Sequence, residues 1–331
     1  MQHRRHFLHT LGSAAAFGAL GPLSLPAAQA AALDQLKIMY GFPAGSSGDT
    51  VARKVAEKLA NGAYCRAAIV DNRPGAGGRI AVELLKSAPA DGSVLTLAPV
   101  SAISVYPYIY PKLTYKPEDV AAVSIGAVMY HGLAVGPAVP PEVKTLKDFL
   151  AWAKAHPQEA NYGSPGAGSM PHLLGALLSL RSGVPLKHVP YKGTVPNVTD
   201  LVGGQIAAAM NPSGDYLQYM KNGKLRVLAT SGHQRSPYLP DVPTFTELGY
   251  PDVTVEEWFG FFAPAKTPAA TVASANAVIT AALKEPSVIE GLGVVGLVAH
   301  GTTAQAMAAD VKAEYERWGP LVKQIGFTAE S

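Results

Sequence analysis

The sequence is poor in cysteine and in charge. Only one of the 331 residues is a cysteine, Cys65, so an internal disulfide, a cysteine-rich zinc site and an iron–sulfur cluster are excluded. Charged residues make up 15% of the chain, against roughly 25% in ordinary soluble proteins. The formal net charge is only +3. Proteins that bind nucleic acid usually carry a basic face or tail, so we expect no nucleic-acid partner.

The sequence also lacks the common signatures of enzymes and metal proteins. It has no G-x-S-x-G elbow, no HExxH motif, no Walker A loop and no C-x-x-C pair. The histidines beyond residue 30 stand singly, without the spacing of metal ligands; they are His131, His156, His172, His188, His233 and His300. We therefore expect no bound metal, no cofactor and no catalytic residue.

Acidic residues are missing from the first 30 positions, which contain Arg4 and Arg5 followed at once by Phe-Leu. An uncharged stretch from about Leu11 to Leu25 comes next, and a small-x-small site ends at Ala30. This pattern predicts a twin-arginine-type signal peptide over residues 1–30, cleaved near Ala30, and a periplasmic mature protein. The apolar stretch is short for a membrane span and is broken by glycine and proline, so an uncleaved anchor is the weaker alternative.

After the signal, short apolar runs alternate with helical patterns. Strands are predicted over residues 36–42, 67–70 and 94–98, and helices over 49–61 and 79–86. This alternation is typical of an α/β fold with parallel strands and helical crossovers. In such folds ligand sites lie at the carboxyl ends of the strands, so the turns there are the places to search.

Three glycine-rich turns each follow a predicted strand and lead into a helix, over residues 41–49, 72–78 and 163–169. A turn of this kind points free backbone N–H groups and the positive end of the helix dipole at one place, which suits an anion. Nearby serine hydroxyls add uncharged donors. A plain tight turn with a Ser or Asp cap explains any single one of them more simply. Two such turns in different lobes favour an anion held between the lobes.

The motifs also occur in a characteristic order. They include Phe42-Pro43-x-Gly45-x-x-x-Asp49, Asn72-Arg73-Pro74-Gly75-Ala76-Gly77-Gly78, Gly163-Ser164-x-Gly166-x-Gly168-Ser169, Val189-Pro190-Tyr191-Lys192-Gly193 and Trp258-Phe259-Gly260. This ordered set resembles the Bug proteins, the TctC-like extracytoplasmic solute receptors of tripartite tricarboxylate transport systems. The resemblance implies a two-lobed, periplasmic-binding-protein-like (type II) fold with a ligand cleft between the lobes. Lobe 1 is expected to comprise residues 31–132 and 255–331, and lobe 2 residues 133–254.

In the family, one loop from each lobe grips a carboxyl group through backbone amides, hydroxyls and ordered waters. The resemblance implies that these loops are Phe42 to Asp49 and Ser164 to Ser169 here. The expected ligand-binding residues are Phe42, Gly45, Ser46, Ser47, Gly48, Asp49, Ser101, Ser164, Gly166, Gly168, Ser169, Tyr191 and Asn211.

Three of these residues have narrower expected roles. Asp49 would repel an anion, so we expect it to cap its helix and order the loop. Tyr191 is expected to line or shape the cleft. Asn211 stands where many relatives have Asp and offers no charge to an ammonium group, which favours a plain mono- or dicarboxylate, aliphatic or aromatic, over an amino acid.

Together these features predict a monomeric binding protein that performs no covalent chemistry. It would capture a small organic carboxylate by hinge closure and deliver it to the membrane components of a tripartite tricarboxylate transporter. One alternative is a ligand-sensing receptor that signals to a sensor kinase through the same cleft. Another is a serine hydrolase using Ser46 or Ser169, against which stands the absence of a histidine at a recognisable spacing to act as base.

Overall fold

The computed structural model describes residues 32–328. The predicted signal peptide and its cleavage site therefore lie outside the described residues. Within the described part, none of the helices is both long enough and apolar enough to cross a membrane.

A six-stranded mixed sheet carries the N-terminal strands. Its order is β11 (Val298–Ala299), β4 (Val120–Met129), β10 (Glu257–Pro264), β3 (Val94–Pro99), β1 (Leu33–Tyr40) and β2 (Cys65–Asn72). Strand β1 pairs in parallel with both β2 and β3. Strand β10 runs antiparallel to β3 and β4. The predicted parallel unit of three strands and two helices is thus confirmed, with β10 added along one edge of it.

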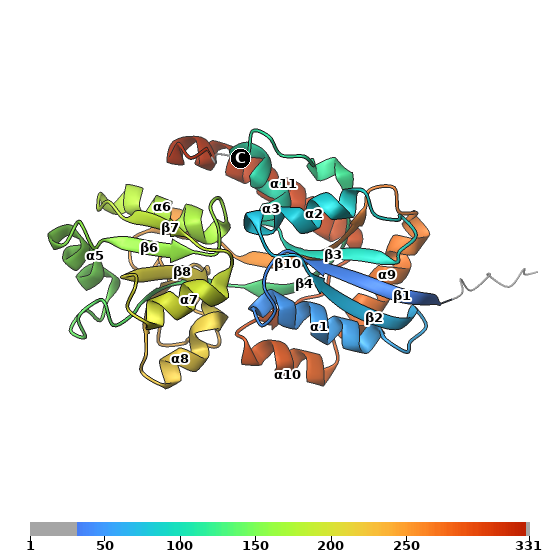
Figure 1. Cartoon of the computed structure of the whole chain (residues 1–331), viewed down its shortest axis with the longest axis horizontal. Helices are drawn as coiled ribbons and strands as arrows, with labels where there is room; N and C mark the ends of the chain where they lie inside the picture. The colour runs from blue at the N-terminus through green and yellow to red at the C-terminus, as the bar shows by residue number, and fades with distance from the viewer. Residues whose placement is uncertain (1–31, 329–331) are drawn as a thin grey trace, which may run out of the picture. The chain divides into compact units, whose positions relative to one another are not determined.

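Helices cover both faces of this sheet (Figure 1). One face carries α1 (Ser47–Leu59), α9 (Ala269–Ala282) and α10 (Pro286–Val294), and the other carries α2 (Arg79–Lys86), α3 (Ser101–Ser104) and α11 (Ala304–Ile325). The alternation of side chains along β1 explains this arrangement. Ile38 and Tyr40 join the core under α1, whereas Met39 joins the core on the opposite face.

A five-stranded mixed sheet forms the second half of the fold. Its order is β7 (Lys187–Pro190), β6 (Asn161–Ser164), β8 (Ala208–Pro212), β5 (His131–Val135) and β9 (Arg226–Thr230). Helices α5 (Leu146–Ala155) and α6 (Met170–Ser182) pack against one face, and α7 (Thr194–Val202) packs against the other. Helix α8 (Leu217–Lys221) lies on the same side as α7 (Figure 1).

Short elements fill the connections between the larger ones. They are η1 (Ala76–Gly78), α4 (Tyr106–Ile109), η2 (Pro117–Asp119), η3 (Ser213–Tyr216) and η4 (Pro251–Val253). The chain leaves the six-stranded sheet after β4, enters the five-stranded sheet at β5, and returns between β9 and β10. The α/β class predicted from the sequence is confirmed, while the exact lobe boundaries stay a prediction.

Candidate functional site

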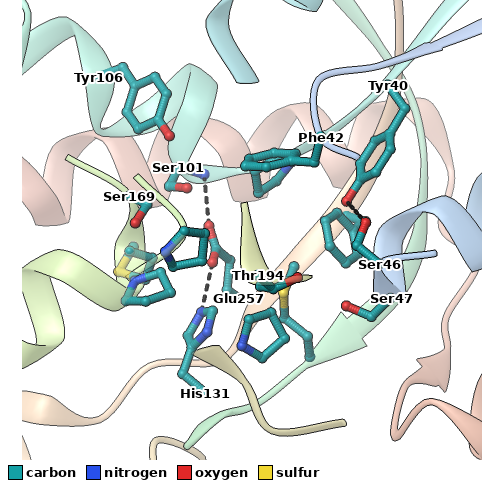
Figure 2. A pocket seen from close by; sticks show the side chains of 17 residues that line it. Tyr40, Phe42, Ser46, Ser47, Ser101, Tyr106, His131, Ser169, Thr194 and Glu257 are labelled. Carbon is teal, nitrogen blue, oxygen red and sulfur yellow. Dashed lines mark hydrogen bonds and ion pairs between the residues drawn. The ribbon is translucent and has the colours of Figure 1, made fainter. Parts of the chain in front are cut away.

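A pocket lies where the ends of both sheets meet the starts of the helices α1, α3, α6 and α7 (Figure 2). Five of the residues predicted from the sequence line it, namely Phe42, Ser46, Ser47, Ser101 and Ser169. Among the described residues that line it, none is a lysine or an arginine, and the one acidic residue is Glu257. Any anion bound here would therefore be held by neutral donors.

The first loop connects β1 to α1 and is closed by its own side chains. Ser46 is the N-cap residue of α1 and has an extended backbone, but its side chain does not cap the helix. Its hydroxyl donates instead to the Pro43 carbonyl at 2.9 Å and lies 3.4 Å from the Tyr40 hydroxyl. A helix start without a side-chain cap leaves first-turn N–H groups for another acceptor.

Asp49 holds the first loop in shape. Its Oδ2 accepts from the Gly45 N–H at 3.0 Å and from Arg53 Nε at 2.8 Å, and its Oδ1 accepts from Asn72 Nδ2 at 2.9 Å. Burial raises the pKa of Asp49, but the Arg53 guanidinium and the two N–H donors outweigh it and hold the pKa below its ordinary value. The carboxylate is thus fully engaged by the protein and does not line the pocket.

The second loop connects β6 to α6 and repeats the same device. Ser169 is the N-cap residue of α6, and it too has an extended backbone and no capping side chain. Its hydroxyl donates to the Gly166 carbonyl at 2.7 Å. Pro171 lies in the first turn, where its missing N–H costs the helix nothing. A second helix therefore begins at the pocket without a side-chain cap.

Neutral groups hold the second loop in shape. The Ser164 hydroxyl donates to the Gly166 carbonyl at 3.0 Å and lies 2.7 Å from His188 Nε2. The Gly168 N–H donates to His172 Nδ1 at 2.9 Å, and the two imidazole rings are stacked with centroids 3.8 Å apart. Burial lowers the pKa of His172 to about 4. Burial, together with His172, lowers the pKa of His188 to about 3. Both rings are neutral at physiological pH.

A buried carboxylate and imidazole form the remaining polar part of the pocket. Glu257 is the first residue of β10, and His131 is the first residue of β5. His131 Nε2 lies 2.7 Å from Glu257 Oε2, and the Ser101 N–H donates to Glu257 Oε1 at 3.3 Å. The two side chains are only 1% and 3% exposed. Figure 2 shows the chain of contacts from His131 through Glu257 to Ser101.

The sequence analysis missed both members of this pair. His131 was grouped with the single histidines, and Glu257 was not considered. The two residues are 126 positions apart, so no local spacing connects them. The available signal was an acidic residue directly before the apolar run Trp258-Phe259-Gly260, because a charge that precedes a buried strand is unusual without a partner.

The remaining predicted residues lie behind or beside the pocket and are absent from the set that lines it. They are Gly45, Gly48, Asp49, Ser164, Gly166, Gly168, Tyr191 and Asn211. Gly166 and Tyr191 line a neighbouring hollow together with residues 75–79. The Tyr191 hydroxyl donates to Asp200 at 2.8 Å. Their role in ligand binding stays a prediction.

Asn211 is held by neighbouring side chains within the five-stranded half. It is fully buried, its amide oxygen accepts from Asn197 at 2.9 Å, and its amide nitrogen donates to the Tyr216 hydroxyl at 3.1 Å. Nearby, burial raises the pKa of Asp215 to about 6, although Thr194 and Ser47 favour its ionised form. The acidic groups closest to the pocket are therefore Glu257 and Asp215, whereas the position singled out from the sequence is neutral.

In residues 32–328 no group of three or more His, Cys, Asp or Glu side chains is arranged to hold a metal ion. The chemistry of the pocket is that of hydroxyl groups, helix N–H groups and one carboxylate–imidazole pair.

Comparisons with known proteins agree with this picture. The sequence profile of a family described as the tripartite tricarboxylate transporter family receptor, TctC, matches residues 51–327. The protein BugT of Bordetella pertussis is 33% identical over 293 residues, which is 88% of this chain and 89% of BugT.

Two solved structures of similar proteins contain carboxylates. A Rhodopseudomonas palustris protein with adipate is 29% identical, with a TM-score of 0.83 over 89% of this chain and 98% of that one. MatC from the same organism, with bound malate, is 28% identical, with a TM-score of 0.80 over 87% of this chain and 98% of MatC. These likenesses confirm the two-lobed, periplasmic-binding-protein-like fold predicted from the sequence.

Proposed function

The chain belongs to the TctC family of tripartite tricarboxylate transporter receptors, and from this premise we propose that it captures a small organic carboxylate in the pocket between its two sheets. The protein is exported to the periplasm by the signal over residues 1–30 and delivers its ligand to the membrane components of a tripartite tricarboxylate transporter. The carboxylates in the two similar structures support this class of ligand.

One observation carries the proposal. Helix α1 packs on the six-stranded sheet and α6 on the five-stranded sheet, and both begin at the same pocket. Each has an N-cap serine whose hydroxyl donates to a backbone carbonyl of the preceding loop, that of Pro43 or Gly166. Neither N-cap side chain takes a first-turn N–H group, and each helix directs the positive end of its dipole at this place. In α1, Asp215 accepts from the Ser47 N–H, and the N–H groups that follow it are left for a ligand. A carboxylate placed between the helix starts satisfies both of them.

Neutral donors suffice for this task because the site is buried. Ser46, Ser47, Ser101 and Ser169 are each at most 5% exposed. Hydrogen bonds to an ionised acceptor contribute more than those between neutral groups, and a low local dielectric strengthens them further. The small net charge of the chain is therefore compatible with binding an anion.

The proposed closure of the two halves rests on the positions of the two helix starts, which belong to different halves of the molecule. Because α1 belongs with the six-stranded sheet and α6 with the five-stranded sheet, a ligand that contacts both helix starts stabilises the arrangement in which they are close. The proposed lobes are residues 31–132 with 255–331 and residues 133–254. The chain crosses at Tyr130, between β4 and β5, and again between β9 and β10, so His131 and Gly132 pair within the five-stranded sheet.

A binding role fits the serines better than hydrolysis does. The Ser46 and Ser169 hydroxyls donate to backbone carbonyls of their own loops, and neither has a hydrogen bond to a histidine among the described residues. His131, the imidazole in the pocket, has Nε2 committed to Glu257. A nucleophilic serine needs a base within hydrogen-bonding reach.

Substitution of Ser47 by proline tests the helix-start site. Ser47 is the first residue of α1, and the extended backbone of Ser46 (φ −78°, ψ 164°) accepts a following proline. The change removes the Ser47 N–H and its hydroxyl, both of which also donate to Asp215. We expect adipate or malate affinity, measured by calorimetry, to fall about 10- to 100-fold, as for the loss of one hydrogen bond to a charged group. Ser47→Ala, which keeps the N–H, is measured beside Ser47→Pro to separate the two losses.

The matched control is Ala269→Pro, at the first position of α9, where the side chain is exposed and the backbone of the preceding Pro268 (φ −56°, ψ 141°) also accepts a following proline. It should leave affinity unchanged. Equal ligand affinity of Ser47→Pro and the unsubstituted protein would show that the start of α1 does not contribute to ligand binding. Failure of every aliphatic and aromatic carboxylate to bind the unsubstituted protein would overturn the proposed function itself.

A further inference from the structure

We propose that Glu257 and His131 form a second recognition point in this pocket, which selects carboxylates that also carry a hydrogen-bond donor, an ammonium or hydroxyl group, over those with a second ionised carboxylate. The inference rests on the proposed function and narrows its ligand class.

The hydrogen bonding of Glu257 leaves room for a ligand. Oε1 accepts the Ser101 N–H at 3.3 Å, and Oε2 pairs with His131 Nε2 at 2.7 Å. An ionised carboxylate has about four lone-pair positions, so two positions remain beyond these partners. Glu257 lines the pocket and is 2% exposed. A donor on the ligand is the kind of group that such a buried acceptor takes.

His131 offers an independent observation. Its Nδ1 is buried and has no hydrogen-bond partner among the described residues, although the residue lines the pocket and is 1% exposed. An ionised carboxylate can only accept, so Nε2 is the donor in the pair with an ionised Glu257, and in the neutral form of the ring Nδ1 is then an acceptor. Buried polar atoms without a partner are uncommon and destabilising. A ligand donor supplies the missing partner for Nδ1.

The balance of charge disfavours a second carboxylate at this point. No lysine or arginine is among the described residues that line the pocket, and Asp215 adds a further buried acid beside Thr194 and Ser47. Two like charges close together in a poorly solvated site repel strongly. A carboxylate at the helix starts and a donor at Glu257 together avoid this repulsion.

The expectation drawn from Asn211 is thereby reconsidered. The uncharged residue at position 211 predicts that amino acids are disfavoured, but the Asn211 side chain is bound to Asn197 and Tyr216 and does not line the pocket. The negative group able to face an ammonium is Glu257, at the start of a different strand.

The first experiment uses the unsubstituted protein and ligands matched in length. Calorimetry compares 4-aminobutanoate, 4-hydroxybutanoate, butanoate and succinate, and then the six-carbon set of 6-aminohexanoate, 6-hydroxyhexanoate, hexanoate and adipate. We expect an amino or hydroxy acid to bind at least about 10-fold more tightly than the diacid of the same length, in one set or both. Tighter binding of the diacid in both sets would overturn the inference while leaving the proposed function intact.

The second experiment assigns the preference to Glu257. Glu257→Gln keeps the size and removes the charge, so the preference over the diacid should shrink at least about 10-fold or invert. Glu256→Gln, one residue earlier and outside the pocket lining, is the matched control and should keep the preference. Persistence of the preference in Glu257→Gln would overturn the assignment. If that variant does not fold, the ratios from the unsubstituted protein decide alone.

Discussion

The two loops that lead into α1 and α6 both end in an N-cap serine that does not cap its helix, but different interactions hold the two loops in shape. The first is ordered by an ionised carboxylate, Asp49, with Arg53 and the Gly45 N–H. The second is ordered by serine hydroxyls and two neutral histidines, the buried His172 and the half-buried His188. Both end with a serine at the helix start whose hydroxyl turns inward. The shared feature is therefore a helix start without a side-chain cap, which an ionised network supports in one loop and neutral groups support in the other.

The loops also differ in what they touch. Nothing lies within 4 Å of a Cβ placed on Gly45, whereas one placed on Gly168 would lie 2.5 Å from Ile109 Cδ1 and 2.8 Å from the Tyr110 hydroxyl. Ile109 and Tyr110 lie in and directly after α4, which follows β3 of the six-stranded sheet in the chain. Gly168 lies in the loop after β6 of the five-stranded sheet, so the contact joins the two halves. The second loop is thus positioned in part by packing against the six-stranded half. The first is held mainly by hydrogen bonds of Asp49 within its own half, while Pro43 lies beside Gly193 and Ser47 donates to Asp215 in the other half.

The largest effect should come from alanine at these two glycines. Both have positive φ, +84° at Gly45 and +77° at Gly168, so each alanine costs about 1–2 kcal/mol of backbone strain. Gly168→Ala adds overpacking against Ile109 and Tyr110, about 1–3 kcal/mol. Urea unfolding should therefore rank Gly168→Ala as less stable than Gly45→Ala, with weaker carboxylate binding as well. Equal stability would contradict tight packing of Gly168 against Ile109 and Tyr110.

Removal of the charge from the first loop should have a smaller effect. Asp49→Asn loses the ion pair with Arg53 and weakens the bond from the Gly45 N–H. We expect about 1–3 kcal/mol lower stability, because a buried network loses its charged acceptor. The pKa of Asp49 is lowered in the folded state, so this stability is present above the ordinary Asp pKa and is lost as pH falls through the folded value.

The control for this substitution is Asp34→Asn, since Asp34 is highly exposed and pairs with an exposed Arg66. It should change stability little. Unfolding curves for both variants at pH 7 test the comparison, and a loss for Asp49→Asn no greater than that for Asp34→Asn would show that the first loop does not depend on its charge.

The smallest effect at pH 7 concerns the two histidines that contact the second loop, because their contribution to the pH dependence of stability develops only as pH falls. Their folded pKa values, about 4 and about 3, lie below the ordinary 6.5. The unfolded chain therefore binds protons first as pH falls, so stability is full above about pH 6.5 and decreases between pH 6.5 and 4. Asp215, whose pKa is raised to about 6, contributes the opposite slope in the same range.

Because of that opposing slope, the informative quantity is the difference between variants. Between pH 6.5 and 4, His188→Gln should reduce the slope of the unfolding free energy against pH, relative to the unsubstituted protein. The reduction corresponds to the uptake of up to one proton on unfolding. His233→Gln, at an exposed position, should follow the unsubstituted protein. Identical slopes for all three proteins, measured by urea unfolding across this range, would mean that His188 is not held neutral in the folded state.

Much of the fold could be predicted because it depends on local patterns. The helix predicted over residues 79–86 coincides with α2, and the strand predicted over 94–98 with β3. The antiparallel insertion of β10 between β3 and β4 was not predicted, because it joins segments more than 120 residues apart in the sequence. Hydrophobic periodicity indicates that a segment is a strand but not which strand it pairs with.

In the candidate site, too, the features with a local sequence signature could be predicted, and those that depend on contacts between distant segments could not. The helix starts at Ser46 and Ser169 could be found because a glycine-rich turn between a strand and a helix is a local signature. The pairing of His131 with Glu257 depends on two chain crossings and has no local signature. For Asn211 the sequence indicated the residue but not its partners, Asn197 and Tyr216, which occupy its amide.

The location of the Glu257–His131 pair affects how the protein samples ligands. Each residue begins a strand directly after the chain has crossed between the sheets. Rotation of one half against the other moves groups near the axis least and groups far from it most. If the halves rotate about these crossings during closure, the pair lies near the axis and the helix starts move further, so an open molecule would already present Glu257 and His131 before the two helix starts come together. Discrimination would then precede capture, and an unsuitable solute would leave without driving closure.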